Sequence, residues 1–270
     1  MRYVDFQVHL PTDQEKGDYL GQQQYQPQEW AQKIGRLKEG ELYITPTVTN
    51  REFTKQDKKY IQAAQQQENI EILGKGIEID TGPRSINIIS QEPSYNFFED
   101  AETKYQLVEA AEQHLEEQNN SFALLSHPFS KDGGLLRDSR PESYEVKTLN
   151  DMDRVAGDHN TNTWIETFRK QPWRTLNQID DDRFGLQQKY DNHGLEIPDI
   201  GSSDVKDPVL AGTSRSPLTT EPETLIDAYQ QATQNTKPQV DTIPTGIMMR
   251  KIGSGIPPIK NTYEKILSQN

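Results

Sequence analysis

Short stretches in which apolar and polar residues alternate recur along the chain, and β-branched residues are common in them. Such alternation is typical of β-strands that bury one face. It predicts strands at 2–9, 41–47, 71–80, 85–90, 121–127, 163–168 and 198–203. Within this set, the segment GIEIDTGPRSINIIS at 76–90 predicts two strands joined by a turn that contains Pro83.

Longer segments between these strands carry apolar residues at helical spacing. Residues 27–38 begin with a proline, and residues 54–67 begin with a threonine, a residue type favoured at helix N-termini. The spacing predicts helices at 27–38, 54–67, 98–117, 171–192 and 221–233. Strands that alternate with helices favour an α/β fold with a largely parallel sheet, whose strand ends meet at one rim. We expect the functional residues at that rim.

Two segments depart from this repeat. Residues 129–162 are polar and rich in Gly, Asp and Asn, which predicts a long loop, either a functional lid or a plain surface excursion. Residues 236–270 follow the last predicted helix, and we expect them to form a C-terminal extension that packs on the main domain. Nothing in the 270 residues compels a further split, so residues 1–235 are predicted to form one domain.

The composition limits the chemistry and the partners. The chain has no cysteine, so any metal must be held by His, Asp, Glu or amide oxygens. The formal net charge of −13 disfavours non-specific binding to nucleic acid or to anionic lipid. No run of 18 apolar residues occurs, and the first residues lack the pattern of a signal peptide. We therefore expect a cytoplasmic protein that does not enter a membrane.

Polar side chains that can bind metals stand at the ends of four predicted strands. Asp5, Gln7 and His9 alternate with apolar neighbours, which predicts that all three share one face of the first strand. The other three segments, Gly76 to Asp80, Leu124 to Pro128 and Ile200 to Asp204, contribute the candidate side chains Glu78, Asp80, His127 and Asp204. A single such residue is commonly a helix cap or a satisfied hydrogen-bonding group, so the weight lies in their combination and order.

In that order the segments resemble the PHP family, the polymerase and histidinol phosphatase domains. Members carry an Asp-x-His-x-His strand, a Thr-Asp-His segment, a Gly-x-Glu segment, a His-Pro segment and a late Ser-Asp-x-His segment. The similar segments here are DFQVHL at 5–10, YITPTV at 43–48, LGKGIEID at 73–80, ALLSHPFS at 123–130 and IGSSDVKD at 200–207. With TWIETF at 163–168 and LAGTSRS at 210–216, the resemblance extends from residue 2 to about residue 235.

The resemblance implies a distorted (β/α)7-type barrel, similar to a TIM barrel, with up to three metal ions at the C-terminal ends of its strands. The sequence departs from the family's pattern at several ligand positions. Gln7 stands where the first histidine is expected, and Thr45-Pro46-Thr47 stands where Thr-Asp-His is expected. Asn87 and Lys206 stand where two further histidines are expected. A three-metal centre is therefore not expected here.

The positions that match the pattern imply a reduced metal site. Carried over one by one, His9, Glu78 and Asp204 would hold a first ion, with Gln7 adding its carbonyl oxygen, and Glu78 would bridge to a second ion bound by His127. One imidazole with mainly oxygen ligands suits manganese, magnesium or zinc. We expect one or two divalent ions at most.

The candidate catalytic residues are Asp204, Lys206 and Arg215. Lys206, in place of a histidine, would supply a fixed positive charge for a phosphate or carboxylate, and Arg215 would assist it. Lys206 is explained equally well as a neutral substitution at a position that no longer has to bind a metal. His114 lies in a strongly charged predicted helix, and we expect it to face the solvent.

Two functions stay open at this stage. The first is a metal-dependent phosphoesterase, in which metal-activated water hydrolyses the phosphate ester of a small molecule or nucleotide. The second is an inactive protein of the same fold that binds a ligand or a partner protein, including a role as an accessory factor in nucleic-acid metabolism. The acidity of the chain speaks against direct contact with nucleic acid. A fold resemblance by itself selects no substrate.

Overall fold

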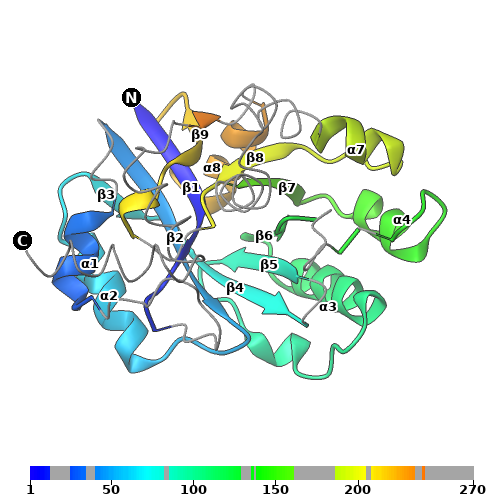
Figure 1. Ribbon diagram of the computed structural model, residues 1–270, viewed down its shortest axis with the longest axis horizontal. Coiled ribbons are helices and arrows are strands. Elements are labelled where there is room, and N and C mark those ends of the chain that lie inside the picture. The colour runs from blue at the N-terminus through cyan, green and yellow to red at the C-terminus, as the bar shows by residue number, and fades with distance from the viewer. Residues whose placement is uncertain are drawn as a thin grey trace, which may run out of the picture.

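A computed structural model describes residues 1–12, 25–34, 40–81, 85–128, 135–136, 138–160, 186–204, 208–234 and 239–240. The strands are β1 Arg2–His9, β2 Glu41–Thr49, β3 Ile70–Ile72, β4 Lys75–Asp80, β5 Ser85–Ser90, β6 Ser121–Leu125, β7 Val155–Asn160, β8 Asp199–Ser202, β9 Ser214–Leu218 and β10 Gln239–Val240. The α-helices are α1 Pro27–Lys33, α2 Lys55–Gln65, α3 Lys104–Glu117, α4 Tyr144–Asp151, α7 Leu186–Asn192 and α8 Leu225–Gln234. Two 3₁₀ turns are η1 Tyr95–Phe98 and η2 Pro208–Leu210. The strands form one central sheet with helices around it (Figure 1).

The sheet is mixed rather than largely parallel. Its strand order is β10-β9-β1-β2-β4-β5-β6-β7-β8, and β3 pairs with β2. The pairs β1–β2, β2–β4, β6–β7 and β7–β8 are parallel. In contrast, β5 runs antiparallel to both of its neighbours, and β9 runs antiparallel to β1. The two strands predicted within residues 76–90 are β4 and β5.

The two ends of this sheet approach each other, so that the eight strands from β9 to β8 form a nearly closed barrel. The Asp204 N–H donates to the Gln7 carbonyl of β1 at 3.0 Å. Within β8, the Gly201 N–H donates to Ser216 Oγ of β9 at 2.8 Å. A Cβ atom on Gly201 would lie 2.2 Å from the carbonyl carbon of Arg215, so only glycine permits this close approach.

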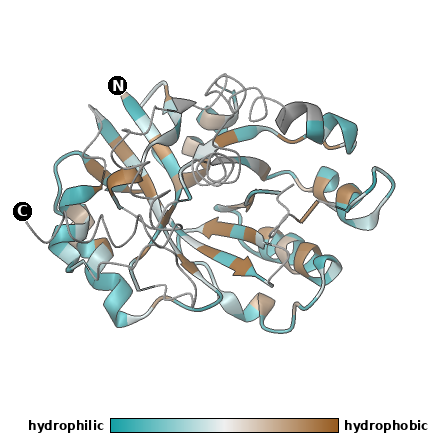
Figure 2. Cartoon of the chain, viewed as in Figure 1, coloured by the Kyte–Doolittle hydropathy of each residue, from teal (hydrophilic) through white to brown (hydrophobic). Residues whose placement is uncertain are grey.

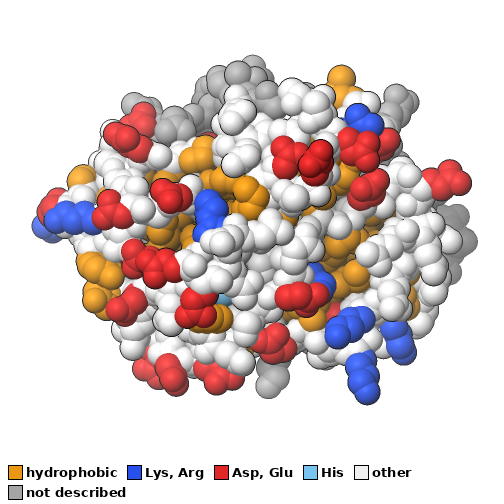
Figure 3. Space-filling model, turned by 180° about the vertical axis from the view of Figure 1, so that it is seen from behind, with side chains coloured by type: hydrophobic (Ala, Val, Ile, Leu, Met, Phe, Trp, Pro, Cys, Tyr) orange, Lys and Arg blue, Asp and Glu red, His pale blue; other side chains and the backbone are white. Residues whose placement is uncertain are grey.

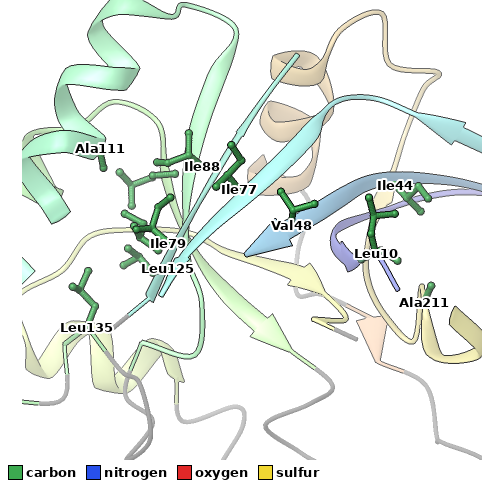
Figure 4. Close-up of a cluster of buried hydrophobic side chains, with 14 of the residues drawn as sticks. Leu10, Ile44, Val48, Ile77, Ile79, Ile88, Ala111, Leu125, Leu135 and Ala211 are labelled. Atoms are coloured by element: carbon green, nitrogen blue, oxygen red, sulfur yellow. The ribbon is translucent and has the colours of Figure 1, made fainter. Parts of the chain in front are cut away.

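The outer face of the barrel buries its apolar residues beneath the helices. Ile77, Ile79 and Ile88 of the sheet lie in one cluster with Ala111 of α3 and Leu125 of β6 (Figure 4). Hydrophobic residues concentrate on the strands and on the helix sides that face them, whereas the outward sides of the helices are polar (Figure 2). This division is the amphipathic pattern from which the strands and helices were predicted.

A second apolar cluster lies inside the barrel. Phe6 of β1 and Phe122 of β6 are not on neighbouring strands, yet their rings meet edge-to-face with centroids 5.1 Å apart. Tyr229 of α8 packs on Phe122 at 4.6 Å. The contact between Phe6 and Phe122 therefore crosses the barrel, and α8 packs against this cluster. Burial of a side chain such as Phe122 contributes roughly 2–3 kcal/mol.

Most predicted elements are confirmed to within a few residues. The predicted strand at 71–80 is two strands, β3 and β4, and the predicted helix at 98–117 begins only at Lys104, after η1. The strand predicted at 163–168 lies outside the described residues, as do most of the helix predicted at 171–192 and most of the extension at 236–270. Of that extension, Gln239 and Val240 pair with β9.

The prediction of a polar loop at 129–162 is wrong for its second half. This part contains α4, whose Val146 and Leu149 are buried, and β7, which lies between β6 and β8 in the sheet. The sequence VAGDHN of β7 lacks apolar alternation. Asp158 points to one face of the strand and is buried although it is polar, and Gly157, on the other face, has no side chain. A Cβ on Gly157 would collide with the hydroxyl of Tyr190.

The charges on the surface agree with the acidic composition. On the face shown in Figure 3, acidic side chains are widely spread, and lysines and arginines form smaller groups among them. Every helix within the described ranges is too short or too polar to cross a bilayer.

Candidate metal centre

Three buried side chains from three strand ends meet at one end of the barrel. His9 ends β1, Glu78 lies in β4 and Asp204 follows β8. His9 Nε2 lies 3.0 Å from Asp204 Oδ1 and 3.2 Å from Glu78 Oε2. One ligand atom from each residue lies within 4.8 Å of the others, so the group could hold a metal ion.

Apolar neighbours orient two of these side chains. Ile77 and Ile79 both belong to the outer cluster, so Glu78 between them faces the interior of the barrel. Val8 and Leu10 belong to the same outer cluster, and His9 between them faces inward in the same way. The hydrophobic effect on the outer face therefore places an imidazole and a carboxylate inside the barrel.

Asp5 does not join this group, contrary to the prediction that it shares a face with Gln7 and His9. The register of β1 against β2 runs from Asp5 opposite Ile44 to Val8 opposite Pro46, so β1 carries one extra residue. Such a β-bulge reverses the alternation of side chains beyond it. The bulge turns Gln7 and His9 to the face that Asp5 does not occupy.

Instead, Asp5 connects β1 to the segments around β8 and η2. Its Oδ1 accepts from the Ser203 N–H at 2.8 Å, and its Oδ2 accepts from the Gly212 N–H at 2.7 Å. Burial raises the pKa of Asp5 to about 6, although these hydrogen bonds oppose the rise. Because Ser203 precedes Asp204, Asp5 fixes the backbone that carries the third member of the group.

Asp204 is held in a strained backbone conformation. Its φ of 47° lies in the left-handed region, which costs a non-glycine residue roughly 1–2 kcal/mol. Its N–H donates to the Gln7 carbonyl, and its carboxylate accepts from Gln7 Nε2 at 3.0 Å. His127 also has a positive φ, of 33°. Strain of this kind clusters at functional sites.

Gln7 presents its amide nitrogen to the group, whereas the sequence suggested its carbonyl oxygen as a ligand. Gln7 Nε2 lies 3.0 Å from Asp204 Oδ1 and 3.2 Å from His9 Nε2. The carbonyl oxygen accepts from Ser126 Oγ at 3.2 Å. Rotation of the amide by half a turn would exchange the two atoms. Ser126 is thus a residue of this site that the sequence analysis did not name.

His127 lies at the edge of the group. Its Nε2 is 3.9 Å from Glu78 Oε1, so the two oxygens of Glu78 face two different histidines. A quarter of the His127 side chain is exposed, more than for His9 or Glu78. Glu78 therefore lies between His9 and His127, and its role in bridging two ions stays a prediction.

Two of the substituted positions also lie beside Glu78. Asn87 of β5 is directly opposite Glu78 in the antiparallel pair, and Thr47 of β2 is opposite Gly76. A Cβ on Gly76 would lie 2.6 Å from Thr47 Oγ1 and 2.8 Å from Asn87 Oδ1. Both side chains are fully buried, so uncharged groups occupy these positions inside the barrel.

The structure gives less support to the proposed cationic residues. Lys206 lies outside the described residues. The Arg215 guanidinium lies 4.2 Å above the ring of Tyr3, and its Nη1 donates to the Gly212 carbonyl at 2.9 Å. The contact with Tyr3 joins β9 to β1. A role for Arg215 in binding phosphate stays a prediction.

The expectation that His114 faces the solvent is wrong. Its side chain is fully buried, and its ring packs edge-to-face on Phe97 at 5.0 Å and lies 6.3 Å from Phe98. Burial lowers the pKa of His114 to about 4. The charged residues near His114 in the sequence lie on the other faces of α3. The composition of the helix therefore led to the wrong prediction that His114 is exposed.

The three clustered side chains fit a divalent ion by both spacing and chemistry. Metal–ligand bonds of about 2.0–2.2 Å place adjacent ligand atoms roughly 2.9–3.5 Å apart. The separations of 3.0 and 3.2 Å at His9 Nε2 fall in this range. A divalent cation would also neutralise two carboxylates that are buried together.

No family model matches the chain, and no curated protein matches it. The geometry of the site and the residues that build it therefore carry the functional argument.

Proposed function

We propose that this protein is a metal-dependent phosphoesterase with a (β/α)7-type barrel of the PHP kind and a reduced metal site. The observation that carries the proposal is the buried group of His9, Glu78 and Asp204, which come from three separate strand ends to within ligand distance of one another. The same three residues are those that the resemblance assigns to one ion. The preferred ion is manganese, magnesium or zinc.

The residues of the chain have separable roles in this proposal. His9, Glu78 and Asp204 hold the ion, which when bound supplies Lewis acidity and lowers the pKa of a coordinated water. Gln7 and Ser126 orient Asp204 through the hydrogen bonds that join them. His127 stands where a second ion would be held against Glu78. The substrate is the phosphate ester of a small molecule or nucleotide.

A second candidate function is ligand binding without turnover. It is favoured by the neutral side chains of Thr47 and Asn87 beside Glu78, because a two-metal clamp on the attacking and leaving oxygens needs more ligands than remain. In this alternative the same group of residues binds a ligand or partner, and the protein acts as an accessory factor.

The first test is the metal content of the purified protein by elemental mass spectrometry after dialysis against manganese, magnesium or zinc. Glu78→Gln is the diagnostic variant, and Glu71→Gln on the exposed side of β3 is the matched control. The proposal expects about one ion per chain in the wild type and the control, and none in Glu78→Gln. A wild-type protein without metal would overturn it.

Hydrolysis of p-nitrophenyl phosphate then separates the two candidates. Release of p-nitrophenolate that depends on the ion, and is lost in Glu78→Gln, supports the phosphoesterase. Stoichiometric metal without turnover on any of a panel of phosphate esters supports the binding protein.

A further inference from the structure

Asn87 stands out among the buried polar side chains beside the candidate metal centre. It lies in the middle of β5 and is fully buried. Neither its amide nitrogen nor its carbonyl oxygen has a hydrogen-bond partner within the described part of the chain. A buried amide that satisfies neither group is costly, so its presence calls for a specific explanation, such as a bound partner or a catalytic role.

The direction of the Asn87 side chain follows from the strand pairing. Asn87 is directly opposite Glu78, and residues opposite each other in an antiparallel pair project from the same face. Its neighbours Ile86 and Ile88 both belong to the outer cluster. Asn87 therefore projects into the barrel beside the Glu78 carboxylate.

On the side that faces Gly76 and Thr47, the neighbours of Asn87 are neutral. Thr47 Oγ1 and the Asn87 amide both border Gly76, which contributes no side chain. The Thr47 hydroxyl donates to the Thr45 carbonyl at 3.2 Å, so its lone pairs remain available as acceptors. Together these groups offer two N–H donors from Asn87 and acceptor oxygens from Asn87 and Thr47. An uncharged group that both donates and accepts, such as a hydroxyl, complements this set.

We propose that Asn87 is a specificity-determining residue that binds a hydroxyl group of the substrate. The substrate class is then a phosphate ester of a polyol, with its phosphoryl group at the ion held by His9, Glu78 and Asp204 and a hydroxyl at Asn87. This inference rests on the proposed function, because the ion places the phosphoryl group. A site built to hydrogen-bond a hydroxyl discriminates against an analogue that lacks it, since its own buried groups are left unpaired.

The test uses two phosphonates that cannot be hydrolysed and that differ only in their hydroxyl groups: 3,4-dihydroxybutylphosphonate and butylphosphonate. Their affinities are measured by isothermal titration calorimetry on protein loaded with Mn²⁺. The wild type is expected to bind the diol about tenfold more tightly, the effect of one net hydrogen bond. Asn87→Leu is expected to lose this preference while it still binds one Mn²⁺ per chain and still binds butylphosphonate.

Ser90→Ala is the matched control. Ser90 is also buried on β5 without a hydrogen-bond partner within the described residues, but it projects from the opposite face to Asn87. It is expected to keep the preference for the diol. Asn87→Ala repeats the test with a smaller side chain, in case leucine prevents folding.

The failures can be told apart. A wild type without the preference, or a preference that survives in both Asn87 variants, overturns the role of Asn87 and leaves the metal site intact. Loss of one Mn²⁺ per chain in those variants shows that Asn87 is a metal ligand and overturns the hydroxyl site. A wild type that binds no Mn²⁺ overturns the proposed function and this inference with it.

Discussion

Ser126 Oγ donates to Gln7 Oε1 at 3.2 Å, and this bond decides which end of the Gln7 amide faces the candidate metal centre. Ser126 follows β6 and Gln7 lies in β1, so the bond joins strands that are not neighbours in the sheet. With its carbonyl held by Ser126, Gln7 offers an N–H to Asp204. An N–H repels a cation, whereas a carbonyl oxygen would bind it.

Ser126→Ala is therefore expected to increase the affinity for Mn²⁺. Without the hydroxyl, the Gln7 amide is free to rotate and add its oxygen to the ligand set. The gain is expected to be roughly three- to tenfold, the equivalent of one net hydrogen bond. Calorimetric titration with Mn²⁺ measures it. Ser121→Ala, at the other end of β6, is the control, and an affinity for Mn²⁺ that falls in Ser126→Ala contradicts this account of Gln7.

His114 makes the stability of the fold depend on pH. Its pKa is about 4 in the folded protein and about 6.5 in an unfolded chain. Between these values the unfolded state binds more protons, so the free energy of unfolding falls as the pH falls from about 6.5 to about 4. The full effect is on the order of 3 kcal/mol.

His114→Leu removes the titrating group and keeps the packing against Phe97. Urea unfolding at several pH values is expected to show a shallower loss of stability below pH 6.5 in this variant than in the wild type. Parallel pH profiles for the two proteins would show that His114 does not carry the dependence.

Much of the site could be predicted because the sequence signals are local. His9 and Glu78 each lie between apolar residues that are buried on the outer face. The alternation of polar and apolar residues therefore predicts that both side chains point inward. The resemblance to the PHP pattern grouped Asp204, which follows the strand predicted at 198–203, with these two residues. Only the inward direction of His9 and Glu78 depends on short-range pattern alone.

Other features could not be predicted because they depend on contacts made elsewhere in the chain. The bulge that separates Asp5 from His9 appears only when β1 is paired with β2. The strand β7 lacks apolar alternation because Gly157 packs against Tyr190 and Asp158 is buried, and neither fact is visible in the local sequence. His114 is buried because Phe97, from a different element, covers it.

Asp5→Asn tests how the fold positions Asp204. Asn has one acceptor oxygen, so its NH₂ group would face either the Ser203 or the Gly212 N–H and leave that donor unpaired. The expected loss of stability is about 1–3 kcal/mol. Thermal unfolding measures this loss, and a weaker affinity for Mn²⁺ is expected with it because Ser203 carries Asp204. Asp153→Asn, outside this network, is the control; equal effects of the two changes would remove the role given to Asp5.

Glu78→Gln distinguishes a metal site from a structural hydrogen-bond network. In a metal site, Glu78 and Asp204 are two buried carboxylates that need a cation, so the neutral variant is expected to be at least as stable as the wild type in the presence of EDTA. With Mn²⁺ at one hundred times its Kd, binding adds about 2.7 kcal/mol to the wild type alone. This corresponds to a rise of roughly 5–10 °C in Tm for a chain of this size.

In a structural network, where His9 forms hydrogen bonds with both carboxylates, Glu78→Gln lowers the Tm to the same extent with and without Mn²⁺. Differential scanning calorimetry in the two buffers therefore decides between the two, because only the metal site reverses the order of stability of the two proteins.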